Sequence, residues 1–175
     1  GFIMKKKVKC IVSVMLAFAL LAGITACGEE VTLSSQQVNG VTIDVPSDFG
    51  EFQDNGQMKM AKNRDSSANI TVSEKIPAQG ATPADFDEET YKAQQFSTFT
   101  DVSVEKYDNN ATCDGNTALY AHVTGTSENK VKLDLYNYIV FFEDDTYQSI
   151  LLSYSSEADT SLKDNVDIIL KSIKY

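Results

Sequence analysis

The stretch "KVKLDLYNYIVFFEDDTYQSILLSYS" (Lys130–Ser155) decides how this chain is built. It begins with apolar residues at alternate positions and passes into a run that is apolar at nearly every position. The first pattern is typical of a strand covered on one face, and the second of a strand covered on both. The short connection Glu143–Thr146 predicts that the segment folds back as an antiparallel hairpin. We therefore expect a hairpin at the centre of a sheet with two covered faces.

Shorter strand patterns and two amphipathic helices surround this hairpin. The predicted strands are Val38–Pro46, Gln57–Lys62, Ala68–Pro77, Asp101–Tyr107 and Thr117–Gly125. A first helix is expected over Pro83–Thr98, because Thr82 can cap it and Asp85 occupies the third helical position of a capping box. A second is expected over Asp159–Lys174, where apolar residues recur at helical spacing. This mixture of strands and helices defines an α+β domain.

Two segments carry a resemblance to a known family. "VTIDVPSDF" (Val41–Phe49) and "ILKSIK" (Ile169–Lys174) resemble the opening strand and the closing helix of the PsbP-like domain. The order of elements over residues 38–175 is similar as well. Membership would imply an α/β/α sandwich with a central, mainly antiparallel sheet, and a leaning toward accessory or binding roles. The resemblance carries over no catalytic residue, because the family shares no active site.

The first 27 residues have the pattern of an export signal. Basic Met4–Lys9 precede an apolar run, Cys10–Ala26, whose 17 residues are fewer than the ~20 that a membrane-spanning helix needs. "ITAC" (Ile24–Cys27) resembles the bacterial lipobox, in which the cysteine becomes the new N-terminus and carries diacylglycerol. Two acyl chains make a stable membrane anchor. A secreted soluble protein and an uncleaved anchor remain the alternatives.

This interpretation divides the chain into three parts. Residues 1–26 are predicted to be a lipoprotein signal peptide, residues 27–37 the lipidated cysteine with a polar tether, and residues 38–175 the folded domain. The lipid bilayer, through the diacylglycerol of Cys27, is then one partner, and the expected location is the outer face of the cell membrane.

Charge excludes one class of partner. The formal net charge is −10, and all acidic residues follow the predicted signal peptide, which itself contains four of the 15 basic residues. A surface this acidic repels phosphate backbones, so nucleic-acid binding is not expected. The further partner predicted is a protein whose identity the sequence does not give.

Four tyrosines are the candidate ligand-binding residues. Alternation along the predicted strands places Tyr120, Tyr136, Tyr138 and Tyr154 on the second face of the sheet. Exposed, they would form an aromatic platform for an apolar or sugar-like ligand. The alternative is that the C-terminal helix covers them.

Other polar motifs favour structural roles. His122 lies between apolar neighbours, and Cys113 is expected to be a small core or loop residue. "YDNNATCDGN" (Tyr107–Asn116) has alternating oxygen donors, but it lacks the glycine and the acidic residue that an EF-hand loop requires, which favours a turn. The acidic clusters Glu143–Asp145 and Asp85–Glu89 are expected at a hairpin tip and a helix N-terminus, although either could attract a cation.

The sequence contains none of the common catalytic motifs. It lacks G-x-S-x-G, a P-loop, the Rossmann glycines, C-x-x-C and H-E-x-x-H. We therefore predict no catalytic residue, metal or cofactor, and a non-enzymatic binding or accessory module. The alternatives are a lipoprotein that binds a solute or metal in an acidic or aromatic pocket, and a carboxylate-dependent hydrolase.

Overall fold

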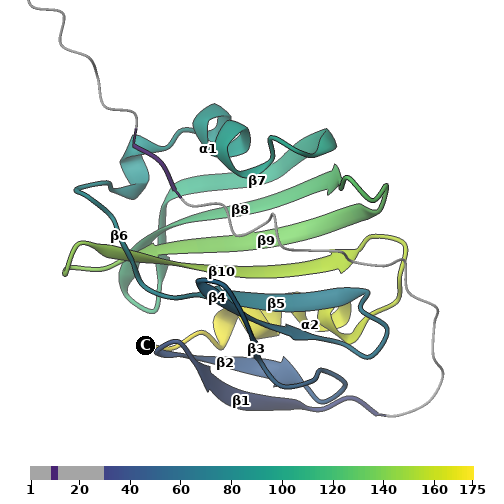
Figure 1. Ribbon diagram of the computed structural model, residues 1–175. Coiled ribbons are helices and arrows are strands. Elements are labelled where there is room, and N and C mark those ends of the chain that lie inside the picture. Colours follow the sequence, from purple (N-terminus) through teal and green to yellow (C-terminus); the bar gives the residue numbers. More distant parts are fainter. Residues whose placement is uncertain (1–8, 12–29) are drawn as a thin grey trace, which may run out of the picture.

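A large antiparallel sheet organises the protein, as seen in a computed structural model that describes residues 9–11 and 30–175 (Figure 1). The strands lie in the order β3-β4-β5-β10-β9-β8-β7, and β6 pairs with one end of β10. The strands and helices are β1 Leu33–Val38, β2 Val41–Pro46, β3 Gln53–Asn55, β4 Met58–Lys62, β5 Ala68–Ser73, β6 Ile76–Pro77, a 3₁₀ turn Pro83–Asp85, α1 Glu88–Gln95, β7 Thr100–Cys113, β8 Asn116–Thr126, β9 Lys132–Phe141, β10 Thr146–Ser155 and α2 Ser161–Lys171.

The β9–β10 hairpin lies inside the sheet, as the sequence predicts. β9 pairs with both β8 and β10, and the hairpin register sets Phe141 opposite Tyr147. Ile139 is buried on one face and Val140 on the other, each with 0% exposure. Asp145 adopts a φ of 59° in the connection, a left-handed conformation that aspartate tolerates well in tight turns.

Two separate apolar cores result from this double coverage. On one face, α1 and the segment before it contribute Phe86, Tyr91 and Phe96 to a cluster with residues of β8, β9 and β10. On the other face, α2 and the β1–β2 hairpin pack against β5, β9 and β10. Figure 1 shows α1 and α2 on opposite sides of the sheet. The predicted α+β sandwich with a central antiparallel sheet is therefore confirmed.

The folded region begins earlier than we predicted. The predicted tether up to Gln37 is wrong over residues 33–37, because these residues form β1 and pair with β2. The turn between them is Asn39-Gly40, with φ values of 47° and 83°. Both residues of a type I′ hairpin turn need such positive φ values, which Asn-Gly supplies readily. The predicted single strand Val38–Pro46 is thus the end of one strand, a turn and a second strand.

The predicted helix Pro83–Thr98 is divided into a 3₁₀ turn and α1. Asp85 accepts a hydrogen bond from the backbone N–H of Thr82 at 2.8 Å, as the capping-box pattern implied. Phe86 then turns into an extended conformation and is fully buried. Asp87 caps α1 by accepting a bond from the N–H of Thr90 at 2.7 Å. Asp85, at the third position of the 3₁₀ turn, and Asp87, at the N-cap of α1, thus start two short elements rather than one long helix.

Helix α2 follows the predicted pattern with slightly shorter bounds. Thr160 caps it by accepting a bond from the N–H of Lys163 at 3.1 Å. Leu162, Val166 and Ile169 are buried against the sheet. Lys174, three residues after the end of α2, exchanges two backbone hydrogen bonds with Thr42 at 2.8 and 2.9 Å. The C-terminus therefore joins α2 to the β1–β2 hairpin.

We expect Ile150→Ala to lower the free energy of unfolding by about 2–5 kcal/mol, because Ile150 is fully buried and its loss leaves a cavity in the α2-side core. The matched control is Ile168→Ala on the outer face of α2, where the side chain is 56% exposed. That change should alter stability by no more than about 0.5 kcal/mol. Urea denaturation measures both, and equal effects would contradict the assignment of this core.

Candidate ligand-binding groove

The structure brings the four predicted tyrosines to the sheet face that carries α2. Tyr120 lies on β8, Tyr136 and Tyr138 on β9, and Tyr154 on β10. The register sets Tyr120 directly opposite Tyr138, and their ring centroids are 4.8 Å apart. Tyr136 and Tyr154 are 6.1 Å apart by the same measure. Strand alternation thus predicted the shared face correctly.

Two of the four tyrosines line an open groove. Tyr120 and Tyr138 contribute to a cavity of about 630 Å³ between the β7–β8 hairpin and the C-terminal half of α2. Its charged lining residues are Lys106, Asp108, Asp114, Asp167, Lys171 and Lys174. The Lys106 Nζ lies 5.6 Å from the centroid of the Tyr120 ring, within the range of a cation–π contact. The volume and the mixed lining suit a ring-bearing ligand with polar substituents.

The other two tyrosines contact each other: Tyr154 is buried, and Tyr136 is half-buried. Tyr136 stacks on His122 with ring centroids 4.0 Å apart and an interplanar angle of 10°. Its hydroxyl lies 3.3 Å from that of Tyr154, which is buried in the same cluster as Leu162 of α2. Coverage by the C-terminal helix, the alternative considered above, therefore applies to Tyr154 and leaves Tyr120 and Tyr138 in the groove.

His122 belongs to a hydrogen-bonded chain that differs from a hydrolase triad. Its Nε2 lies 2.9 Å from Asp134 Oδ1, and the Ser156 hydroxyl donates to Asp134 Oδ2 at 2.7 Å. In a triad the serine would bond the histidine, which accepts its proton. Here serine and histidine both bond the carboxylate, so the arrangement gives the hydroxyl no base. It links β8, β9 and the end of β10.

The environment of Asp134 keeps it ionised. Burial acts to raise the pKa of this carboxyl, but hydrogen bonds from His122 and Ser156 outweigh burial and hold the pKa below its usual value. An ionised carboxylate accepts both bonds more strongly than a neutral acid would. The network is therefore a means of fixing neighbouring strands.

The tyrosines facing α2 are held in their neutral form. Burial, assisted by the nearby Tyr138, raises the pKa of Tyr120 to about 12. Burial also raises the pKa values of Tyr136, Tyr138 and Tyr154. Neutral phenols keep a hydroxyl proton to donate, so the groove offers a ligand two aromatic faces and two hydrogen-bond donors.

Cys113 lines the same groove but is buried, with 5% exposure. Burial and the neighbouring Asp114 raise the pKa of its thiol to about 11. The thiolate, which is the nucleophilic form, is therefore disfavoured at neutral pH. This agrees with the prediction that Cys113 is a small core residue.

The stretch Tyr107–Asn116 is mostly strand rather than the turn that we expected. Residues up to Cys113 belong to β7, and the turn is confined to Asp114-Gly115, with φ values of 46° and 78°. β7 bulges at several points along its pairing with β8. Within residues 9–11 and 30–175, no group of three or more His, Cys, Asp or Glu side chains is placed to hold a metal ion.

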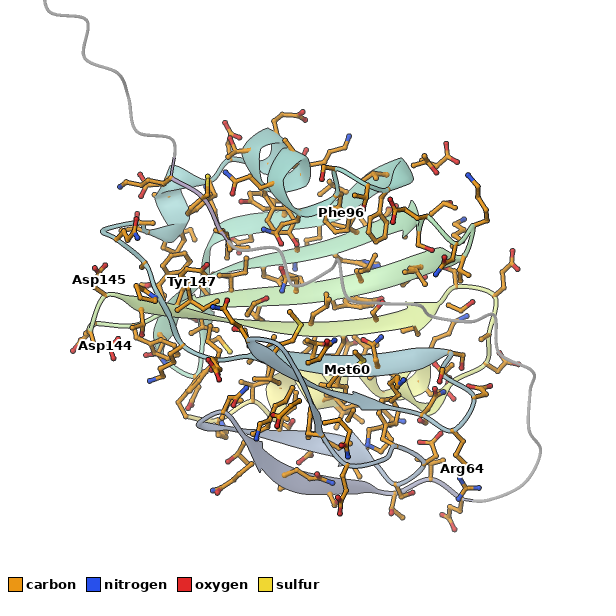
Figure 2. All side chains as sticks on the ribbon, in the orientation of Figure 1. Met60, Arg64, Phe96, Asp144, Asp145 and Tyr147 are labelled. Atoms are coloured by element: carbon orange, nitrogen blue, oxygen red, sulfur yellow. The ribbon has the colours of Figure 1, made fainter. Side chains whose placement is uncertain are left out.

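The two acidic clusters lie where we predicted and bond to the backbone. Figure 2 shows Asp144 and Asp145 at the outer tip of the β9–β10 hairpin. Asp145 accepts a bond from the N–H of Gly80 at 2.9 Å, which ties this tip to the loop before the 3₁₀ turn. Asp85 and Asp87 cap helical turns, and bonds from Thr82 and Thr90 lower their pKa values.

The opposite face of the sheet carries polar residues that sequence analysis missed. Asn69, Thr71 and Ser153 alternate with apolar residues of the α2-side core and therefore face the α1 side. Their side chains are buried, and within the described part of the chain their polar atoms have no hydrogen-bond partner. The signal was present in "ANITVS" (Ala68–Ser73), whose second face, formed by Asn69, Thr71 and Ser73, is entirely polar.

The predicted lipidation site, Cys27, lies outside the described residues, as do residues 1–8 and the rest of 12–29. Among the residues that are described, no helix is long and apolar enough to cross a membrane.

Comparison with solved structures shows a shared fold. The Ran-binding protein Mog1p of Saccharomyces cerevisiae matches with a TM-score of 0.56 and 9% identity, covering 83% of this chain and 96% of that one. CyanoP, the cyanobacterial PsbP of Synechocystis sp. PCC 6803, matches with a TM-score of 0.55 and 13% identity, covering 88% and 98%. LpqN of Mycobacterium tuberculosis matches with a TM-score of 0.52 and 12% identity, covering 83% and 91%.

The PsbP-like fold predicted from the sequence is thus confirmed. No protein-family model and no curated protein sequence matches the chain. At these identities the likeness concerns the fold alone, and the residues of the groove have to be interpreted from their own chemistry.

We expect stability to fall at alkaline pH. The folded-state pKa of Tyr120, about 12, lies above its ordinary 10.0, so the stability that it contributes is complete below pH 10.0 and is lost as pH rises toward 12. The raised thiol pKa of Cys113 acts in the same direction from its ordinary 9.0. Phenolate absorbance should therefore appear together with loss of the native circular dichroism. Full ionisation of the tyrosines in a chain that keeps its native spectrum would contradict these shifts.

Proposed function

We propose that the protein is a bacterial lipoprotein, anchored by diacylglycerol on Cys27 at the outer face of the cell membrane, whose domain binds a partner without catalysis. The anchor rests on the sequence: basic Met4–Lys9, an apolar run and "ITAC" (Ile24–Cys27). The first described strand starts at Leu33, and five residues, 28–32, lie between it and the proposed anchor in the sequence. The domain would then lie close to the membrane surface.

The observation that carries the binding role is the groove beside Tyr120 and Tyr138. It combines aromatic faces, lysines and carboxylates in one accessible cavity. Two residues that could suggest catalysis have other roles. The single histidine, His122, forms a hydrogen bond with Asp134, and Cys113 is buried, which raises the pKa of its thiol. A binding module therefore fits the chemistry of this face better than a hydrolase does.

The fold neighbours support an accessory role on the cell surface. Mog1p is described as Ran-binding, and LpqN as involved in cell envelope biogenesis. CyanoP is a cyanobacterial PsbP. These descriptions belong to those proteins, and they favour a fold that serves binding in different settings.

Metabolic labelling with a radioactive fatty acid tests the anchor. We expect label on the wild-type chain and its complete loss in Cys27→Ala, because only the thiol at the lipobox position is alkylated. Cys10→Ala, a change within the predicted signal peptide, is the matched control and should keep the label. A mature protein free in the medium, starting at a residue other than Cys27, would refute the proposed anchor.

A second candidate function, binding of a small solute, is favoured specifically by the Tyr120–Tyr138 pair. Sugar rings pack on aromatic faces through their apolar C–H groups, and burial of about 40 Å² of apolar area contributes about 1 kcal/mol. Calorimetric titration with a neutral oligosaccharide such as cellotetraose should therefore show binding that Tyr138→Ala weakens about fivefold or more. Tyr138→Phe keeps the ring and is the matched control. Flat titrations with the wild-type chain would rule out saccharide binding in this groove.

A further inference from the structure

Residues Lys9–Ile11 lie beside α1, on the sheet face opposite the tyrosine groove (Figure 1, purple segment). One side chain binds both ends of this short segment. The Gln94 amide accepts a hydrogen bond from the backbone N–H of Ile11 at 3.0 Å and donates one to the backbone C=O of Lys9 at 3.0 Å. A side-chain amide used in this way recognises an extended backbone, much as a neighbouring strand would.

Further contacts come from the same side of the domain. Gln95 donates to the C=O of Ile11 at 3.4 Å. The Lys9 ammonium forms an ion pair with Asp85 at 3.0 Å and donates to the C=O of Gly80 at 3.2 Å. Backbone and basic side chain are therefore recognised separately, by α1 and by the segment that leads into it.

The side chain of Ile11 is buried in the α1-side core. Ile11 is 5% exposed and belongs to the α1-side core, although it is about 70 residues or more from every other member along the chain. The members that come from the segment before α1 and from α1 itself include Ala78, Ala81, Phe86 and Tyr91. Figure 2 shows Phe96, another member, beneath α1. Without residues 9–11, this core would have an unfilled position for one aliphatic side chain.

We propose that this site is a peptide-binding groove, in which residues 9–11 of the uncleaved chain occupy the place of a partner's segment. In the mature protein it would bind an extended segment of a partner protein that has a basic residue followed, two positions later, by an aliphatic one. The proposal rests on the proposed function, because cleavage before Cys27 is what releases residues 9–11. The net charge of −10 favours a basic segment over an acidic one.

Titration with a synthetic peptide tests the groove. The probe is KKVKSIVS, which is residues 6–13 with Cys10→Ser, and the receptor is the chain shortened to residues 27–175. This shortened chain keeps every described strand and helix, since these lie within residues 33–175. We expect it to bind the peptide at least tenfold more tightly than the full-length chain does, because in the latter the groove is already filled.

Variants then assign the contacts. Gln94→Ala removes two hydrogen bonds and should weaken binding about tenfold. Gln37→Ala, on the distant and exposed edge strand β1, is the matched control and should change nothing. Asp85 also accepts a hydrogen bond from the N–H of Thr82, so a double-mutant cycle is needed to isolate its contact with the peptide. Asp85→Asn in the receptor and Lys9→Gln in the peptide should each weaken binding. The two changes together should weaken binding by less than the product of the two separate fold-changes.

A complementary experiment uses a variant of the full-length chain. Lys9→Glu combined with Ile11→Asp should expel the segment, so that the full-length variant binds the peptide as tightly as the shortened chain. Equal binding by the two unmodified forms, no binding at millimolar peptide, or an unchanged affinity in Gln94→Ala would overturn the proposal. These titrations use purified chains, so their failure is distinct from loss of fatty-acid label, which refutes only the anchor.

Discussion

Burial of the β9–β10 hairpin on both faces is the constraint on which the rest of the structure depends. Ile139 and Val140, adjacent in β9, point to opposite faces and are both fully buried. A sheet with two apolar faces needs a covering layer on each, and α1 and α2 with the β1–β2 hairpin supply these layers. Each layer is short relative to the sheet, so each leaves part of its face for other contacts. The tyrosine groove and the site of residues 9–11 occupy those two parts.

The two faces differ in chemistry as well as in covering element. On the α2 side, Tyr120 and Tyr138 border a groove with charged walls. On the α1 side, Gln94 binds an extended backbone, and small polar side chains of the sheet such as Asn69 and Thr71 are buried. The first arrangement suits a ring, and the second suits a peptide. If both proposals hold, one domain would bind two different ligands on opposite faces of the sheet, without competition between them.

Local sequence patterns predicted the elements with the strongest periodicity. They failed where long-range contacts determine the structure. The central hairpin and α2 followed from apolar spacing alone. β1 was missed because its edge position leaves polar residues such as Gln37 exposed, so that it lacks alternation, although Asn39-Gly40 carried a hairpin signal. Alternation placed the tyrosines on one face, but the position of α2 decides which of them stay accessible. The hydrogen bond between Gln94 and Ile11 joins residues that are 83 positions apart, so no local pattern can predict it.

Occupation of the α1-side site by residues of the same chain has a further physical consequence. A tethered segment acts at an effective concentration in the millimolar range for a short flexible connection, so a free peptide of equal intrinsic affinity competes poorly with it. Removal of the signal peptide abolishes that advantage at once. The same cleavage leaves Cys27 as the first residue, which would hold the domain at the membrane. The mature, anchored protein would therefore lack residues 9–11, and its groove would be free for the segment of a partner.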